Sequence, residues 1–434
     1  MLNWFREKRN NRVPGPGEQL PPTHPEKIFE GIRLPRTFDA LRHHNYRLYW
    51  FGNLFSLTGT WIQSIATGWL VLQLSNSPFM VGLNSTLGSL PAWFTSLPGG
   101  ALADRFNKRN LMVINQSLMA VFASVLAILA WTGAITIQHI LIISCVSGFV
   151  ATMNAPIFQS MVTELVGRKD LLNAIALNST LFNTARIIGP SIAGVLLTSV
   201  GAATCFGINA VSFLAIIIPL CFVRLQVPDR HRTGETMWQR IREGLRFVGA
   251  HPDIRVLIIM MTVFGAFGIL YLPLMPVFAR DVFHAGPKGY GILMTAIGIG
   301  AVFGGLTMAT LSRTRYKGRI LTFGTLVLSL LIIVMSLVRD MKLATVLFAC
   351  IGFCQTTVAS LTNTLIQTLA PDHVRGRVMS VYTLSFNGLF PLGSFLGGAI
   401  AQKAGAPAAT IAGASVVLVS LAIVSLLRPQ IRRL

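Results

Sequence analysis

Twelve apolar segments, each long enough to cross the roughly 30 Å hydrocarbon core of a membrane as a helix, constrain this chain most. Only 12% of the 434 residues are charged, which is too few to cover the surface of a soluble protein of this length. The sequence therefore predicts an all-α integral membrane protein with twelve transmembrane helices. Their approximate limits are 46–74, 79–102, 111–132, 139–163, 171–199, 203–223, 254–279, 289–311, 320–338, 343–366, 376–402 and 407–427.

The basic residues lie in short clusters between the apolar segments. A formal charge of +21 would suit a nucleic-acid-binding protein if it formed one patch, but this scattered pattern is typical of membrane loops and excludes that class. If the N-terminal tail is cytoplasmic, thirty of the 36 lysines and arginines fall on the cytoplasmic side. Basic loops stay inside, so both chain ends are predicted to be cytoplasmic.

The longest internal connection separates six predicted helices from six. The domain prediction is a mobile tail (1–45), a first bundle (46–223), a cytoplasmic linker (224–253), a second bundle (254–427) and a short tail (428–434). Apolar residues at three- and four-residue spacing predict an amphipathic linker helix over Met237–Ala250, either on the inner leaflet or as a plain connection.

The two halves resemble each other in sequence. A shift of 204 residues places Phe182 on Phe386, Asn183 on Asn387 and Gly194 on Gly398. Two such six-helix bundles are related by an axis along the membrane normal, and transporters of this construction bind substrate between the halves near the midplane. The sequence thus predicts two pseudo-symmetric bundles with a binding site between them.

The loop after the second helix reads GALADRFNKR over Gly100–Arg109. It resembles the signature loop of the major facilitator superfamily, with Asn107 where the family often has glycine. The resemblance implies that Asp104, Arg105 and Arg109 help to latch a cytoplasmic gate, and that Glu164 and Arg168 are their partners. The alternative is a positively charged anchor without a gating function.

The fifth helix contains Gly189-Pro190 and then Gly194. This is similar to the Gly-Pro element of antiporter-type members of the superfamily, although the last spacing is one residue longer. Small residues permit close helix contact, and Pro190 bends the helix because it lacks an N–H donor. We therefore expect Gly189, Pro190 and Gly194 to be helix-packing residues.

Three further stretches narrow the resemblance: Arg42–Trp50, Trp69–Leu74 and Leu274–Gly291. Together they look like the bacterial branch that contains enterobactin-type siderophore exporters and macrolide efflux pumps. This implies a bacterial inner-membrane protein that exports a siderophore-like or related amphiphilic molecule by alternating access. Multidrug or macrolide efflux is the alternative, and lipid or lysolipid transport and a non-transporting scaffold are further ones.

Arg186 is the sole charge that falls in the middle of a predicted helix. Such a residue costs about 2.5–3.5 kcal/mol to insert, so it should face a cavity. Asn183, three residues earlier, shares its helical face. One interpretation is that Arg186 binds an anionic substrate; the other is that it bonds a backbone carbonyl or the kink. Further polar residues that could be either substrate contacts or interhelical bonds are Gln63, Asn154, Tyr271, Gln355 and Asn387.

The sequence predicts no cofactor and no metal. Its five cysteines lack metal-ligand spacing, and no catalytic group is paired at one membrane depth, so an enzyme is not expected. The expected partners are a small molecule, with an anion as the leading candidate, and membrane lipids, around a functional monomer. Outward movement of an anion gains about 2.3 kcal/mol per 100 mV, which predicts export driven at least partly by membrane potential.

Overall fold

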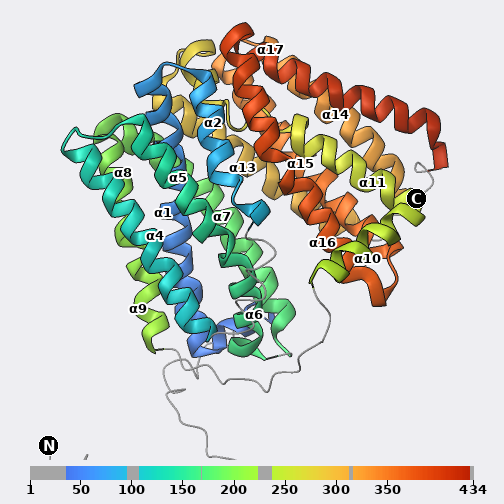
Figure 1. The fold of residues 1–434 in the computed structure, drawn as a ribbon, viewed down its shortest axis with the longest axis horizontal. Helices are drawn as coiled ribbons and strands as arrows, with labels where there is room; N and C mark the ends of the chain where they lie inside the picture. The colour runs from blue at the N-terminus through green and yellow to red at the C-terminus, as the bar shows by residue number, and fades with distance from the viewer. Residues whose placement is uncertain (1–35, 95–106, 168, 223–236, 312–315, 431–434) are drawn as a thin grey trace, which may run out of the picture. The chain divides into compact units, whose positions relative to one another are not determined.

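The computed structural model describes residues 36–94, 107–167, 169–222, 237–311 and 316–430. All regular secondary structure in these ranges is helical (Figure 1). Residues 40–434 form one compact unit. The predicted N-terminal tail falls mostly outside the described ranges, as do Asp104, Arg105 and Arg168.

Within the described residues, the first six predicted spans fall on helices, and residues 95–102 of the second span lie outside those residues. The fourth span is divided at Met153, three residues before Pro156, whose missing N–H interrupts the ladder there. The sixth is divided at Phe213. The helices of this half are α1 (His44–Ser75), α2 (Pro78–Ser89), α4 (Lys108–Trp131), α5 (Ile137–Thr152), α6 (Asn154–Val166), α7 (Leu171–Ser199), α8 (Gly201–Ser212) and α9 (Leu214–Phe222).

Five of the second six spans also fall on helices, the seventh span is interrupted, and all six are preceded by the expected linker helix. The chain bends by 113° between that helix and the next. The elements are α10 (Met237–Ala250), α11 (Pro252–Val263), the π-helical turn η3 (Phe264–Gly268), α12 (Met275–Val277), the π-helical turn η4 (Phe278–Val282), α13 (Gly286–Leu311), α14 (Lys317–Leu337), α15 (Met341–Leu369), α16 (Asp372–Gly388) and α17 (Phe390–Leu427).

By length and hydropathy alone, eight described helical stretches can cross a membrane, or nine when a bent pair counts as one span. One of the eight, Asp372–Leu427, contains two of the predicted spans. The chain turns within it at Gly405, whose φ of 86° lies in the left-handed region that glycine adopts readily. The relatively polar α1 fails the hydropathy criterion, and α2 runs into residues that the structure does not describe.

The seventh span differs from the single helix that hydropathy predicts over 254–279. Helical geometry ends at Ile269, whose φ and ψ are −112° and 19°. Pro273 lies four residues later, so its ring would clash with the carbonyl group of Ile269 in a continuous helix. The result is an irregular stretch flanked by the π turns η3 and η4, and Tyr271 lies within it.

Corresponding glycines give the two halves similar packing. In α7, a Cβ atom on Gly189 would overlap the side chain of Trp61 in α1. In α17, a Cβ atom on Gly393, 204 residues later, would overlap the backbone of Ala266 in η3. Both glycines therefore let a helix approach the first membrane-spanning segment of its own half, as the internal repeat predicts.

A second glycine in each of these helices contacts the other half. A Cβ atom on Gly194 in α7 would lie 3.1 Å from the Cα atom of Gly291 in α13. A Cβ atom on Gly398 in α17 would lie 3.1 Å from the Cα atom of Gly82 in α2. The halves thus meet along two seams, α7 with α13 and α2 with α17 (Figure 1). We call these the glycine seams.

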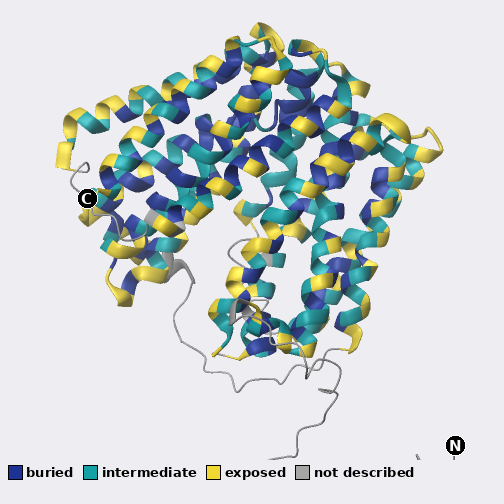
Figure 2. Ribbon diagram, turned by 180° about the vertical axis from the view of Figure 1, so that it is seen from behind, coloured by how far each residue is buried: buried dark blue, intermediate teal, exposed yellow. Residues whose placement is uncertain are grey.

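Buried residues lie between the helices, whereas the outward faces carry many exposed side chains (Figure 2). Those exposed side chains include large apolar ones such as Trp131 (85% exposed) and Leu172 (82% exposed). Soluble proteins rarely expose so much apolar surface in continuous patches, and lipid tails are its natural solvent.

Candidate functional site

Three of the predicted substrate-binding residues come together from three different segments. The Tyr271 hydroxyl donates a hydrogen bond of 2.5 Å to Oε1 of Gln355 in α15. Arg186 of α7 is close enough to Tyr271 for the two side chains to interact electrostatically. The cluster joins α7 of the first half to the irregular stretch and α15 of the second half.

Arg186 is the charged member of this cluster. Within the described residues, it forms no hydrogen bond and no ion pair, and the residue is only partly buried. The backbone of Arg186 lies against Gly298 of α13, so packing along the α7–α13 seam fixes where the Arg186 side chain leaves the helix. A guanidinium binds a carboxylate or a similar pair of oxygens through two parallel N–H bonds. The cluster can therefore bind an anionic group beside a phenol and an amide.

Two other predicted amides bond between helices of the first half. Oε1 of Gln63 in α1 accepts a hydrogen bond of 2.7 Å from Nδ2 of Asn209 in α8. Oδ1 of Asn154 in α6 accepts one of 2.9 Å from Nε2 of Gln116 in α4. These contacts match the interhelical alternative for both residues. Their assignment to a substrate remains a prediction.

Among the described residues, the remaining two predicted amides form no hydrogen bond with Arg186, Tyr271 or Gln355. Asn183 donates a hydrogen bond of 2.8 Å to the carbonyl of Ser179 in its own helix. Asn387 in α16 is exposed. Asn183 lies one helical turn before Arg186 in α7, whereas its counterpart in the internal repeat, Asn387, lies in α16.

The gating residues that the structure describes contact their own half. Nε of Arg109 donates a hydrogen bond of 2.6 Å to the Leu220 carbonyl, and its Nη2 donates to the Cys221 carbonyl. These carbonyls lie in the last described turn of α9, where a cation complements the helix dipole. Glu164 forms an ion pair with Lys108, which lies in the signature loop but was not among the predicted gating residues.

Sequence reasoning missed a contact between the halves at Arg280. Its Nη1 donates to the Leu72 carbonyl (3.2 Å) and to Oδ1 of Asn76 (2.9 Å), while its Nε donates to Oδ1 of Asp281 (2.6 Å). Asn76 follows α1 in the left-handed conformation, with φ of 49°, which ends the helix beside Arg280. We call this group the Arg280 clasp. The signal for it was the Arg280-Asp281 pair at the end of the seventh span.

Polar contacts reinforce the glycine seams. Along α7 and α13, Oγ of Ser191 lies 2.8 Å from Oγ1 of Thr295. Along α2 and α17, Thr86 donates a hydrogen bond of 3.0 Å to the Pro391 carbonyl. The Arg280 clasp lies near the start of α2, close to the turn between α1 and α2. These contacts therefore join the halves on the side of the bundle that carries this turn.

In the described part of the chain, no three histidine, cysteine, aspartate or glutamate side chains gather in a way that could hold a metal ion.

The fold matches solved transporters. The nucleoside transporter NupG, solved as a point mutant, superposes with a TM-score of 0.74 at 12% identity, covering 89% of this chain and 99% of that one. A bacterial homologue of the human lysosomal transporter Spinster, inward-facing and unoccupied, superposes with a TM-score of 0.67 at 14% identity, covering 90% and 96%. These matches show that the chain shares the fold of these solved transporters.

Similar sequences cover most of the chain. The multidrug efflux pump Tap of Mycolicibacterium fortuitum is 29% identical over 88% of this chain and 95% of its own. The staphyloferrin A transporter of Staphylococcus aureus is 26% identical over 80% and 87%. The enterobactin exporter EntS of Citrobacter koseri is 25% identical over 90% and 93%.

The family model described as transmembrane secretion effector matches residues 36–432, which is nearly the whole chain. Its span includes both bundles, both glycine seams and the Arg186 cluster. The chain therefore belongs to the transmembrane secretion effector family of the major facilitator superfamily, and it is a multi-pass membrane transporter rather than an enzyme.

Proposed function

We propose that this transporter exports a small anionic or amphiphilic molecule, and that Arg186, Tyr271 and Gln355 bind it. The supporting observation is an Arg186 guanidinium that lies between the halves with no hydrogen bond or ion pair among the described residues. An arginine placed inside a membrane is costly, and such residues commonly mark a substrate pathway. An anionic ligand would neutralise it during transport.

The leading cargo class is a siderophore-like molecule. Relatives named as a staphyloferrin A transporter and an enterobactin exporter support this class. Carboxylate or catecholate oxygens suit a guanidinium that can donate two parallel hydrogen bonds. Tyr271 already donates its hydroxyl proton to Gln355, so its oxygen and the Gln355 amide N–H groups can complete the contacts.

The second candidate is multidrug efflux. The relative named as the multidrug efflux pump Tap, at 29% identity, favours it. Under this alternative, the aromatic and amide groups of the cluster contact a larger amphiphile, and the Arg186 charge contributes less to binding than it does for an anion.

We further propose that both chain ends are cytoplasmic, because thirty of the 36 basic residues then face the cytoplasm. The glycine seams and the Arg280 clasp would then close the outer side in this state. Cargo would reach the Arg186 cluster from the inside, and one negative charge moving outward would gain about 2.3 kcal/mol per 100 mV. We propose that the monomer suffices for this cycle.

The decisive experiment compares a deletion strain with its parent under iron limitation. Mass spectrometry measures which small molecules stay inside the cells, and susceptibility to a macrolide panel is scored in parallel. We expect retained siderophore and unchanged drug tolerance, rescued by the wild-type gene and by Lys403→Gln, a control that removes an exposed charge. Arg186→Gln should fail to rescue.

The contrary outcomes separate the proposals. Normal siderophore secretion with lost drug tolerance would replace the leading cargo class by the second. Full rescue by Arg186→Gln would refute the assigned binding role. In proteoliposomes, flux that follows an imposed pH gradient and ignores an imposed potential would refute potential-driven export.

A further inference from the structure

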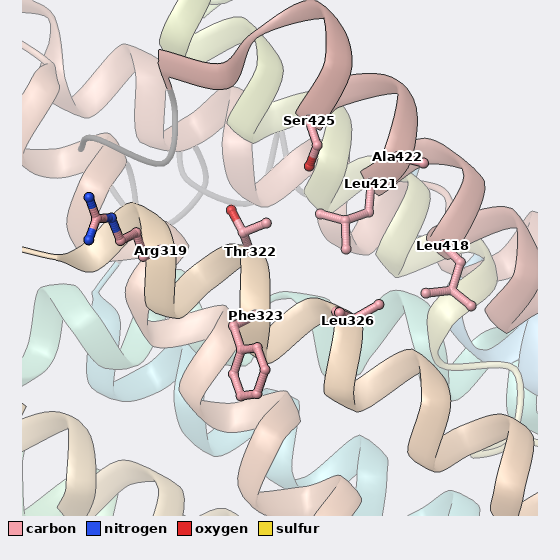
Figure 3. Close-up of a pocket in the computed structure, with 8 residues that line it drawn as sticks. All are labelled: Arg319, Thr322, Phe323, Leu326, Leu418, Leu421, Ala422 and Ser425. Carbon is pink, nitrogen blue, oxygen red and sulfur yellow. The ribbon is translucent and has the colours of Figure 1, made fainter.

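A groove of about 390 Å³ lies between α14 and α17, away from the Arg186 cluster. Its volume is at the lower end of the roughly 300–1,000 Å³ of ligand pockets. Thr322 of α14 and Ser425 of α17 lie on opposite walls (Figure 3). The groove is lined by Arg319, Thr322 and Leu326 from α14 and by Leu418, Ala422 and Ser425 from α17.

The groove has one charged end and one apolar end. Arg319 lies at the first end, whereas Leu326 and Leu418 lie at the second (Figure 3). Seven residues separate Arg319 from Leu326, which is about 10 Å along a helix. Phe323, between them, is 68% exposed, so the groove faces the surroundings of the protein. A cationic mouth above an apolar channel of this length suits a molecule with an anionic head and a hydrocarbon chain.

The Arg319 guanidinium is held at this mouth by an aromatic ring. Its central carbon lies 5.1 Å from the centre of the Tyr316 ring, a cation–π contact that limits its movement. Among the described residues, no carboxylate pairs with it. Between Asp281 and Asp340, and again after Asp372, the sequence contains no acidic residue. Both helices that form the groove are therefore flanked at this end by basic residues alone, including Arg428 after α17.

We propose that an anionic phospholipid binds in this groove, with its phosphate on Arg319 and one acyl chain between α14 and α17. The mouth lies at the start of α14 and the end of α17, where the basic clusters place it at the membrane surface. Each basic residue near such a surface strengthens the attraction to anionic lipid. The site is independent of the cargo, so it stands or falls separately from the proposed export function.

Native mass spectrometry of the purified full-length protein tests this directly. The protein is titrated with phosphatidylglycerol and, separately, with phosphatidylethanolamine of the same chain length. We expect phosphatidylglycerol to be retained preferentially. Arg319→Gln should weaken the apparent affinity of the protein for phosphatidylglycerol about fivefold, which is the contribution of a single basic residue near an anionic membrane surface. Ala422→Trp, which fills an exposed part of the groove without changing charge, should also reduce retention.

Two matched controls keep the interpretation specific. Lys403→Gln removes a positive charge from the other end of the last span, and Val419→Trp adds the same bulk on an exposed face of α17 that does not line the groove. Both should retain lipid as the wild type does. Equal retention of the two lipids, retention of detergent only, or unchanged phosphatidylglycerol binding in Arg319→Gln and Ala422→Trp would overturn the proposal.

Discussion

We predict that a side chain added at Gly82 shifts the protein away from the state in which the glycine seams are closed. A Cβ atom at this position would lie 2.5 Å from the Ser394 carbonyl oxygen and 2.8 Å from the Cα atom of Gly398. Both neighbours are backbone atoms of α17, which cannot rotate away as a flexible side chain would. Gly82→Val should therefore force α2 and α17 apart.

The size of the expected shift follows from the free-energy cost of overpacking. Inserting carbon atoms into a packed site costs typically about 1–3 kcal/mol. That cost applies only while the seam is closed, so it lowers the ratio of closed to open molecules by about 5- to 150-fold. If the halves move as rigid bodies, opening at α2 and α17 also opens the other seam.

A disulfide across that other seam provides the measurement. Ser191→Cys and Thr295→Cys are introduced into a variant that lacks the five native cysteines. They replace hydroxyl oxygens that lie 2.8 Å apart. We expect Gly82→Val to slow oxidation of this pair at least about fivefold in membranes. The control is Gly207→Val, because a Cβ atom at Gly207 has no neighbour within 4 Å. An unchanged oxidation rate in Gly82→Val would refute the idea that the two seams open together.

Three further predictions concern single arginines. Arg186→Gln removes a charge-assisted hydrogen bond to an anionic cargo, which contributes about 1.5–3 kcal/mol. The apparent affinity for that cargo should therefore fall at least tenfold in vesicle transport assays. Unchanged affinity would contradict the proposed site. Arg280→Ala removes the clasp on Asn76 and should increase labelling of Thr295→Cys by a membrane-impermeant maleimide; equal labelling would mean that the clasp does not hold the halves together. Arg109→Gln leaves the last carbonyls of α9 without their donor and should lower the thermal unfolding temperature in detergent, whereas Lys403→Gln should not.

The fold could be predicted from the sequence because lipid imposes simple rules. Every polar backbone group must be bonded internally, so long apolar segments become helices, and the described part of every predicted span is helical apart from the irregular stretch in the seventh. The linker helix over Met237–Ala250 has the same limits in the structure. Hydropathy does not show where a helix is interrupted, however. Pro156 and Pro273 were the available signals for the interruptions at Met153 and Ile269.

The candidate site was predictable only in part. Arg186 was conspicuous because a midplane charge is rare, and Tyr271 and Gln355 were chosen as polar residues at similar depth. Hydropathy gives depth along a helix but not the direction of a side chain, so Gln63 and Asn154 could not be separated from them. The Arg280 clasp was missed because exposed loop charges usually contribute little, and only the left-handed turn at Asn76 aligns its acceptors.

The π turns on either side of Tyr271 have a mechanical consequence. A π turn closes its hydrogen bonds over one residue more than an α turn, so the two forms interconvert by whole residues and not by gradual bending. Relaxation of η3 to α geometry would advance the following residues by one position, which turns a side chain by about 100° around the helix axis. We expect such a relaxation to move Tyr271 in a discrete step, and η4, which contains Arg280, offers the same kind of step on the same segment.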